Sequence, residues 1–294
     1  MDLSLQGLQG LIRTGTLSST LPPRQARITL GTLGALGIIL ALNQLLNRVA
    51  LHNSSWNSRW DWRREIVLVT GGSSGLGDLT PLPANVQFYE MDVSSPEQVQ
   101  RVAKLIREDV GEPTVLVNNA GIGTMKTILQ GTEEETRRTF DVNILALFTL
   151  ARAFIPSMIE KNHGHVITIA SMASFITIPS NVDYSCTKAA ALAFHEGLAQ
   201  ELKHRYNTTN VKTSIIHPTF VRTPLLEEHL QKGPFKDQLL DPNIVTDAIV
   251  TQILRGKSGQ VFLPNSHSFI SGIRGFPVWL QELLRSSRAD VLRA

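Results

Sequence analysis

The chain has 294 residues, 42% of them apolar and 18% charged, which suits a buried core in one large domain or in one domain with an appendage. Its formal net charge is only +3 and the sequence has no strongly basic run, so we expect no nucleic-acid partner. The single cysteine, Cys186, excludes an internal disulfide framework.

A 19-residue stretch near the N-terminus, 28–46, carries no charge and is about the length that crosses the core of a bilayer. We predict a transmembrane helix or a deep membrane anchor. A buried or interfacial helix is the alternative, because Asn43 and Gln44 make the end of the stretch polar. Arginines are more frequent after the stretch than before it, which favours a cytoplasmic C-terminal body. A mitochondrial transit peptide is a rival interpretation, because Asp2 is the only acid before Asp61.

From Glu65 onward, short apolar runs typical of buried strands alternate with stretches of helical periodicity. The predicted strands are 66–70, 86–93, 114–121, 165–171, 211–218 and 260–264. The predicted helices are 96–110, 133–161, as one helix or two, and 183–206. This alternation predicts an α/β fold in which helices cover both faces of a parallel sheet. Ligands of such sheets bind at the carboxyl ends of the strands.

A glycine-rich turn, Gly71 to Gly77, directly follows the first predicted strand. Glycines at such a turn let the backbone approach a pyrophosphate and present amide groups to it. A turn of this kind is weak evidence when it stands alone, and its weight here comes from the residues that accompany it.

Tyr184 and Lys188 lie four residues apart on a predicted helix and therefore share one face. A nearby ammonium lowers the pKa of a tyrosine, so Tyr184 is a candidate general acid or base for an alcohol or a carbonyl. Ser171 ends a predicted strand at the edge of the sheet where ligands bind. A chance tyrosine–lysine pair and an ordinary strand-end serine are the structural alternatives.

Five motifs in this order resemble those of the short-chain dehydrogenase/reductase family. They are TGGSSGLG at 70–77, NNAG at 118–121, DVN ending at Asn143, Ser171 placed 13 residues before Tyr184, and HPTFVRT at 217–223. The resemblance covers about residues 65–264 and implies a Rossmann-like, doubly wound parallel sheet. Together with the N-terminal apolar segment, it is similar to the membrane-bound branch that includes retinol dehydrogenases and 17-beta-hydroxysteroid dehydrogenases.

The resemblance implies a role for each matching residue. Tyr184 would pass the proton, Lys188 would hold the nicotinamide ribose, Ser171 would bind the reacting oxygen, and Asn143 would support a water that links Lys188 to solvent. The cofactor-binding residues, besides Tyr184 and Lys188, would be Gly71, Ser73, Ser74, Gly75, Leu76, Gly77, Asp78, Asp92, Val93, Asn118, Asn119, Ala120, Gly121, Val221 and Thr223. We expect no metal, and His163 and His165 are interpreted as surface histidines.

The chain departs from the family immediately after the glycine-rich turn. The family continues with a helix and a second strand, whose terminal residue reads the adenosine ribose about 20 residues after the fingerprint. Here DLTPLPANVQFY follows Gly77 at once, so Asp78 resembles that strand-end acid joined directly to the turn. We therefore expect a fold without the first crossover helix and the second strand, with an open sheet edge or re-paired strands. The connection from Gly77 to Asn85 should be irregular, and intact flanks favour a splice variant or a missed exon as its origin.

These features predict a nicotinamide-dependent oxidoreductase that interconverts an alcohol and a carbonyl on a lipophilic substrate, such as a retinoid, a steroid or a fatty alcohol. NAD is expected rather than NADP, because a carboxylate at Asp78 accepts hydrogen bonds from the ribose 2′-hydroxyl and repels a 2′-phosphate. The resemblance implies the endoplasmic reticulum or a lipid droplet as its membrane. The alternative is a non-catalytic membrane-associated variant or an unstable product, which binds dinucleotide poorly.

The predicted organisation has three parts: an N-terminal segment with the membrane anchor at 1–64, a dehydrogenase domain at 65–264, and an apolar tail at 265–294. The tail is interpreted either as a lid or membrane-surface helix beside the substrate mouth, or as a dimer or core contact. A homodimer is therefore one of the expected partners. The segment 225–235 falls where family members carry a substrate lid.

Overall fold

The chain divides into two compact units, Met1–Ser55 and Trp56–Ala294. The computed structural model describes residues 37–39, 41–51, 60–77, 85–231, 235 and 237–292. In the first unit, residues 37–39 and 41–50 are helical and their side chains are exposed. The predicted membrane segment 28–46 is therefore described in part, because its residues 28–36 and 40 lie outside the described ones.

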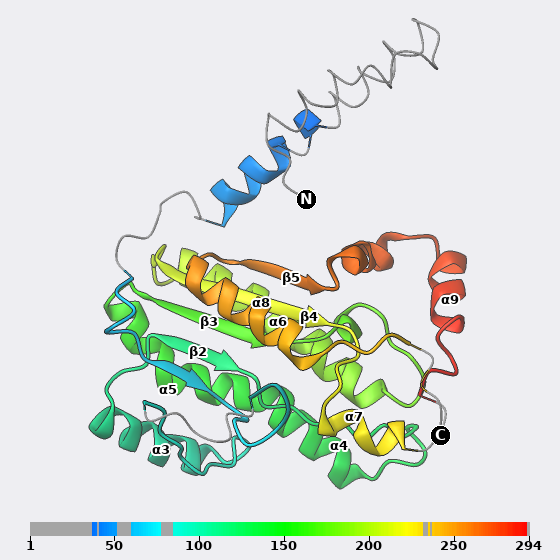
Figure 1. Ribbon diagram of the computed structural model, residues 1–294, viewed down its shortest axis with the longest axis horizontal. Coiled ribbons are helices and arrows are strands. Elements are labelled where there is room, and N and C mark those ends of the chain that lie inside the picture. Colours follow the sequence, from blue (N-terminus) through cyan, green and yellow to red (C-terminus); the bar gives the residue numbers. More distant parts are fainter. Residues whose placement is uncertain are drawn as a thin grey trace, which may run out of the picture. The chain divides into compact units, whose positions relative to one another are not determined.

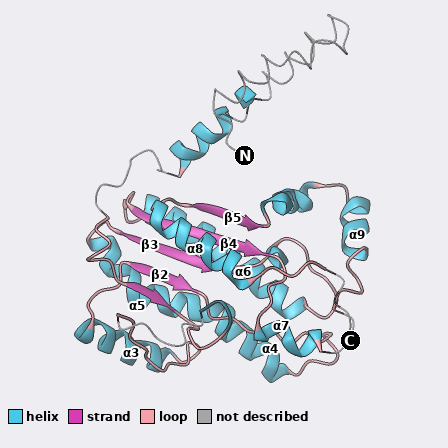
Figure 2. Cartoon of the chain, in the orientation of Figure 1, coloured by secondary structure: helices cyan, strands magenta, loops and turns pink. Residues whose placement is uncertain are grey.

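The second unit is built on a parallel sheet of five strands in the order β1-β2-β3-β4-β5 (Figures 1 and 2). The strands are β1 (Val67–Val69), β2 (Val115–Asn118), β3 (Gly164–Ile169), β4 (Val211–Pro218) and β5 (Gly259–Leu263). Every residue of β2, β3 and β4 is buried. This is the burial expected for central strands of a sheet that helices cover on both faces, so the α/β fold class follows from the observed sheet.

Helices connect the strands along the chain. They are α3 (Pro96–Asp109), α4 (Glu133–Phe140), α5 (Ala146–Glu160), α6 (Val182–His204), α7 (Pro224–Leu230), α8 (Pro242–Arg255) and α9 (Val278–Ser286). A π-helical segment, η2 (Asp141–Leu145), joins α4 to α5, and η4 (Asn265–Gly275) is a 3-10 helix. Local chemistry explains where α3 begins: the Ser95 hydroxyl accepts a hydrogen bond from the Gln98 amide at 3.2 Å, and Pro96 occupies the first turn.

Two apolar clusters hold the helices against the two faces of the sheet. One joins Ile106 of α3, Phe154 of α5 and Leu202 of α6 to the sheet residues Leu116 and Val166. The other joins α8 to the opposite face, where its residues Val245, Ile249 and Ile253 pack against neighbours that include Val115, Ile167 and Ile216. Three helices therefore cover one face, whereas α8 is the long helix described on the other.

Among the described residues, one helical stretch, Glu133–Glu160, is long and apolar enough to cross a membrane. It consists of α4, η2 and α5, and 56% of its most apolar window is buried inside the fold. Its apolar character is therefore used in the core of the domain, where Phe154 is almost fully buried.

The prediction of a strand at 86–93 is wrong. Residues 86–92 are irregular and pair with none of the described strands. A strand needs a hydrogen-bonding neighbour, and the strand that would stand between this segment and β1 in the family is the one missing from the sequence. Instead, the Tyr89 hydroxyl hydrogen-bonds Asp109 of α3 at 3.0 Å, and Met91 packs against the core. Among the described residues β1, three residues long, is left as an open edge, one of the two outcomes expected.

The interpretation of His163 and His165 as surface residues is also wrong. β3 begins at Gly164, so His165 falls within a strand that is buried on both faces. Its Nε2 lies 2.9 Å from the Ser214 hydroxyl of β4. His163 is largely buried and its Nε2 lies 3.0 Å from a carboxylate oxygen of Glu65.

Candidate active site

A cavity of about 940 Å³ opens at the carboxyl ends of the strands. The predicted site residues that line it are Gly71, Ser74, Gly75, Leu76, Asp92, Val93, Asn119, Ala120, Gly121, Ser171, Tyr184, Lys188, Val221 and Thr223. Four others, Ser73, Gly77, Asn118 and Asn143, do not line it. Asp78 lies outside the described residues.

The glycine-rich turn packs closely against the segment that follows β2. Gly71 has a φ of +70°, and a Cβ there would lie 2.9 Å from the Ala120 Cα. A Cβ at Gly77 would lie 2.4 Å from the carbonyl oxygen of Gly71. Asn119 secures this contact, because its Nδ2 donates to the Thr70 carbonyl at 2.9 Å. The backbone of the turn therefore forms part of the cavity wall without intervening side chains.

The turn ends in η1 (Gly75–Gly77), a 3-10 helix of three residues. Residues 78–84 lie outside the described part of the chain, so the connection expected to be irregular is described only at Gly77 and Asn85. A pyrophosphate-binding turn acts through the N-terminus of the helix behind it, which contributes oriented amides and a dipole. Among the described residues, η1 is the helical segment that immediately follows the turn, and it is too short to supply that dipole.

Asn143 lies in the π-helical segment η2 and holds the cavity wall in place. Its Nδ2 donates to the Ile122 carbonyl at 2.8 Å and to the Thr187 hydroxyl at 3.0 Å, and its Oδ1 accepts from the Ile122 amide at 2.8 Å. The side chain thus joins the segment after β2 to α6. The wide turn of a π-helix turns this side chain inward, and such bulges are frequent at functional sites.

Ser171 follows β3 and caps η3 (Met172–Ser174), with its hydroxyl accepting a hydrogen bond from the Ala173 amide at 3.1 Å. The same hydroxyl is 3.4 Å from the Pro218 carbonyl and also hydrogen-bonds Tyr184. The backbone of Ser171 is held by His217 of β4, whose Nδ1 lies 3.2 Å from the Ser171 carbonyl oxygen. The sequence did not single out His217, although it precedes Pro218 in a recognised motif.

Tyr184 and Lys188 face the cavity from the first turns of α6, as their spacing predicts. The Lys188 Nζ lies 5.3 Å from the centroid of the Tyr184 ring and donates a hydrogen bond to the Ile169 carbonyl at 2.9 Å. A Cβ at Gly121 would lie 3.5 Å from this Nζ, and one at Gly123 would lie 3.1 Å from the Tyr184 ring. The structure therefore brings the phenol, the ammonium and the Ser171 hydroxyl to one wall.

Burial controls the protonation of this pair. It raises the pKa of Tyr184 to about 12, and the hydrogen bond from Ser171 opposes this rise only in part. Burial also lowers the pKa of Lys188 to about 8. In this arrangement the burial of the phenol dominates its pKa and the Lys188 Nζ bonds the Ile169 carbonyl, and the role of Lys188 in lowering the pKa of Tyr184 stays a prediction.

Asp92 and Val93, which the resemblance implies as adenine contacts, line the same cavity. Asp92 is paired with Arg138, Nη1 to Oδ2, at 2.9 Å, and accepts hydrogen bonds from the amide and hydroxyl of Ser94. Partial burial alone would raise the pKa of Asp92, but these partners outweigh it and hold the pKa below its ordinary value. No sequence motif pointed to Arg138, which also lines the cavity.

The two remaining predicted cofactor residues follow β4. Val221 pairs with Leu240 in an isolated parallel bridge, and the Thr223 hydroxyl lies 3.4 Å from the Val221 carbonyl. Thr223 also faces the glycine-rich turn, since a Cβ at Gly75 would lie 3.7 Å from it.

Part of the cavity wall is formed by an apolar cluster. Ile178, Leu226, Val291 and Leu292 form a buried cluster there, and all four line the cavity. Arg288 of the tail pairs with Asp237, which holds the end of the chain against this wall. The structure places Val291 and Leu292 of the tail in this buried cluster, and the alternatives given for the tail stay predictions. Val291 and Leu292 were not predicted as site residues, because two apolar residues near a terminus carry no periodic signal.

In the part of the chain that the structure describes, no group of three or more His, Cys, Asp or Glu side chains is arranged to hold a metal ion.

A family model described as short chain dehydrogenase matches residues 79–233. The matched range begins just after the glycine-rich turn, at the position where the family's crossover helix and second strand are missing from this chain.

Curated relatives extend the match over more of the sequence. Dehydrogenase RED2 of Cochliobolus heterostrophus is 40% identical over 208 residues, covering 63% of this chain and 78% of the relative. Human Estradiol 17-beta-dehydrogenase 11 is 30% identical over 239 residues, covering 70% of this chain and 77% of the relative. Human 17-beta-hydroxysteroid dehydrogenase 13 is 32% identical over 233 residues, covering 68% and 75%.

Solved structures share the fold. A short-chain dehydrogenase from Streptomyces avermitilis has a TM-score of 0.63 at 24% identity and covers 78% of this chain and 99% of its own. A 4-hydroxyisoleucine dehydrogenase complexed with NADH has a TM-score of 0.60 at 21% identity, covering 67% of this chain and 96% of its own. These structures support the architecture, and the family model and the curated relatives support the lineage: the chain belongs to the short-chain dehydrogenase family.

Proposed function

We propose that the chain derives from a membrane-anchored, nicotinamide-dependent oxidoreductase that interconverts an alcohol and a carbonyl on a lipophilic substrate. The observation that carries the proposal is the convergence of Ser171, Tyr184 and Lys188 on one wall of a cavity whose far end is apolar. The Ser171 hydroxyl would hold the reacting oxygen, and Tyr184, bonded to Ser171, would exchange a proton with it. Lys188 would bind the cofactor ribose.

The cavity fits a nicotinamide cofactor more completely at one half than at the other. Gly71, Gly121 and Gly123 lie so close to Ala120, Lys188 and Tyr184 that backbone, not side chains, borders the space beside them. The nicotinamide group would supply the acceptor or donor of a hydride. Asp92 and Val93, proposed for the adenosine half, line the cavity. The residue proposed to read the ribose, Asp78, lies outside the described residues, and NAD is proposed over NADP on the chemistry of its carboxylate.

An apolar substrate is proposed from the composition of the cavity wall. Ile178, Phe220, Leu226 and Leu292 surround the space beyond Tyr184, and burying an alkyl chain or ring system there removes apolar surface from water. The relatives named as 17-beta-hydroxysteroid dehydrogenases support this class. The proposed class includes retinoids, steroids and fatty alcohols.

Membrane attachment is proposed from the N-terminal segment. Its described helical residues 37–39 and 41–50 carry exposed apolar side chains, including Ile38, Ile39 and Leu42. A lipid environment would cover them. We propose the endoplasmic reticulum or a lipid droplet, with the domain on the cytoplasmic side and the mitochondrion as the alternative, for the reasons of charge and composition given above.

The catalytic assignment is tested in the chain with the crossover helix and second strand, about 20 residues, reinserted between Gly77 and Asp78. This protein should oxidise or reduce a hydrophobic alcohol or ketone, and Tyr184→Phe should lower turnover by at least ~100-fold because the proton-transfer group is lost. Circular dichroism should be unchanged. Tyr89→Phe is the matched control, since that hydroxyl bonds Asp109 away from the catalytic wall. Full turnover in Tyr184→Phe would show that the assignment is wrong.

A second candidate is a non-catalytic, membrane-associated variant. It is favoured by the three-residue η1 after the turn and by the open edge of β1. Thermal unfolding with and without NAD separates the two candidates, since a cofactor that binds the native state raises its melting temperature. Stabilisation of the reinserted chain but not of the 294-residue chain would favour the second candidate for this form. Equal stabilisation of both would exclude it.

A further inference from the structure

The segment between β2 and α4 ends in an apolar tip. Ile128 is 72% exposed and Leu129 is 96% exposed. Single exposed apolar residues are ordinary on protein surfaces. Two adjacent ones at the tip of an otherwise polar turn are different, because neither contributes to the core and both present their side chains to whatever lies outside.

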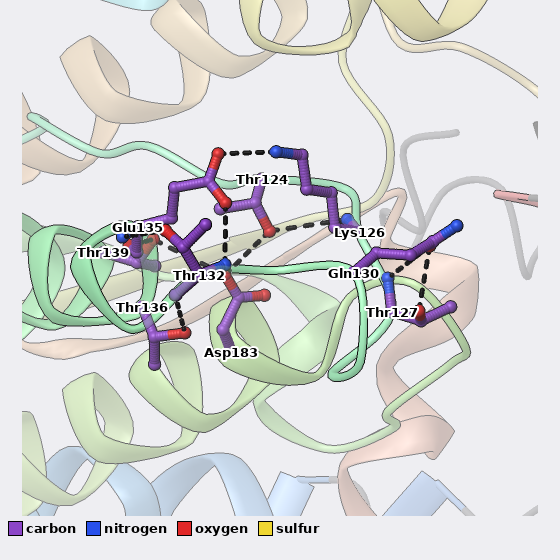
Figure 3. A network of polar contacts seen from close by, with 9 residues as sticks. All are labelled: Thr124, Lys126, Thr127, Gln130, Thr132, Glu135, Thr136, Thr139 and Asp183. Atoms are coloured by element: carbon purple, nitrogen blue, oxygen red, sulfur yellow. Dashed lines mark hydrogen bonds and ion pairs between the residues drawn. The ribbon is translucent and has the colours of Figure 1, made fainter.

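A network of polar contacts holds this tip in a fixed position (Figure 3). The Thr124 hydroxyl donates to Asp183, the residue before Tyr184, at 3.0 Å. Lys126 pairs with Glu135 of α4 at 2.6 Å, and Glu135 also completes a capping box with Thr132. Both ends of the segment are thereby tied to α4 and α6, so the tip is presented on a rigid support.

The turn itself is closed by side chains. The Thr127 amide and hydroxyl both donate to Gln130 Oε1, at 3.2 and 2.9 Å. Thr127 and Gln130 thus hydrogen-bond each other across the turn (Figure 3). Ile128 and Leu129, which lie between them in the sequence, are exposed.

The segment that carries the tip also contributes to the cavity wall. Met125, from the same segment, packs with Leu226 of α7 and with Val291 and Leu292 of the tail, and all four line the cavity. Three elements therefore meet at this part of the wall: the segment 124–132, α7 and the C-terminal tail. Within the tail, the helix α9 also exposes apolar residues, namely Val278, Trp279 and Leu283. We call these three residues, together with Ile128 and Leu129, the apolar rim.

The chemistry of the apolar rim fits a lipid surface. Its members come from two separate elements and are small in number, whereas a stable protein interface needs about 800 Å² on each partner. Trp279 is 69% exposed beside Pro277, and exposed tryptophans are enriched where proteins meet the headgroup region of a membrane. The described helical residues 37–39 and 41–50 of the same chain also expose apolar side chains, and the membrane attachment proposed for them would bring the chain to a lipid surface.

We propose that the apolar rim docks on a lipid surface and that the cavity takes its substrate from that surface. The proposal rests on the proposed function for the nature of the substrate. Docking requires no turnover. A vesicle-binding measurement therefore tests the docking, and an activity assay tests the proposed function.

The test uses the full chain carrying an environment-sensitive nitrobenzoxadiazole label. Leu129→Cys is labelled in a Cys186→Ser background, because Cys186 is exposed and would react as well. The control is Leu254→Cys in the same background, on the outer side of α8, where Leu254 is 59% exposed. With phosphatidylcholine vesicles containing phosphatidylserine, the label at 129 should shift to shorter wavelength and brighten severalfold, whereas the label at 254 should not change.

Each result of the labelling experiment either supports or overturns the docking proposal. If the chain sediments with vesicles while the label at 129 stays unchanged, the N-terminal segment binds alone and the proposal is overturned. A shift at 129 that occurs without vesicles and grows with protein concentration would mean that a second copy of the chain covers the rim, which also overturns it. A shift at 129 only with vesicles, in a reinserted chain that turns over no hydrophobic alcohol or ketone, would support docking and count against the proposed function alone.

Discussion

At the scale of residues, the pair Tyr184 and Lys188 shows how burial changes what spacing predicts. Four positions on a helix place the two side chains on one face, and both face the cavity. Their pKa values, however, depend on how much water each group loses. Burial raises the pKa of Tyr184 to about 12 and lowers that of Lys188 to about 8, so both groups resist taking up charge.

These shifts predict a dependence of stability on pH. The pKa of Lys188 falls from 10.5 to about 8 on folding, so between these values the unfolded chain binds more protons than the folded one. The contribution of Lys188 to stability therefore rises with pH across that window. Tyr184 acts in the opposite sense: its pKa rises from 10.0 to about 12, so its contribution is lost as pH climbs above 10.0.

Lys188→Met should remove the rise in stability between pH 8 and 10.5, an effect of at most a few kcal/mol. Urea unfolding at closely spaced pH values measures it. Lys104→Met, an exposed lysine on α3, serves as the control and should leave the profile unchanged. An unaltered rise in Lys188→Met would mean that other groups produce it.

At the scale of elements, local capping chemistry explains α4. Thr132 accepts a hydrogen bond from the Glu135 amide at 3.1 Å, and the Glu135 carboxylate accepts one from the Thr132 amide at 3.0 Å. Both partners lie within four residues in sequence, so this helix start needs no tertiary contact to form.

Thr132→Ala should lower the free energy of unfolding by about 1 kcal/mol, because an orphan amide of α4 loses its acceptor. Chemical denaturation measures this change. Thr136→Ala is the control, since that exposed hydroxyl only bonds back to the Thr132 carbonyl within the helix. Equal losses in the two variants would argue that helix propensity, not the cap, is responsible.

The glycine-rich turn has less structural support here than in the family, where a full helix follows it. Its packing against Ala120 and Asn119 is intact, but only the three-residue η1 is described behind it. Binding of the remote adenosine half normally helps to position the nicotinamide, so its loss should weaken both binding and hydride transfer.

We therefore predict that the 294-residue chain binds NAD weakly, with no heat signal at micromolar concentrations in isothermal titration. The reinserted chain should bind NAD in the same experiment. Micromolar affinity of the 294-residue chain would reject this prediction and would require residues 78–84 to restore the adenosine site.

At the scale of the whole molecule, two compact units divide the chain. The first presents helical residues with exposed apolar side chains, and the second is an α/β domain whose cavity ends in an apolar wall. A membrane-bound enzyme for lipophilic substrates would need both features.

Ile39→Arg tests the anchor directly. It places a charge near the middle of the segment 28–46, at a cost of about 2.5 kcal/mol or more in a bilayer. The variant should shift from the membrane pellet to the supernatant after carbonate extraction. Val49→Arg, beyond the segment, should remain in the pellet. Equal extraction of both variants, or of neither, would contradict an anchor that ends at residue 46.

The sequence by itself determined much of the succession of strands and helices, because periodicity and turn residues are local properties. It predicted a strand at 86–93 that is absent and did not predict α8. It also indicated Ser171, Tyr184 and Lys188, because a parallel sheet delivers residues at strand ends and the start of the next helix to one edge.

Tertiary structure decided the rest. Whether 86–93 becomes a strand depends on a neighbour that local sequence does not report, and the residues now contact α3 instead. The wall formed by Val291 and Leu292, the pairing of Asp92 with Arg138, and the raised pKa of Tyr184 likewise depend on contacts between distant segments. Burial and long-range pairing set these properties, and both exist only once the chain has folded.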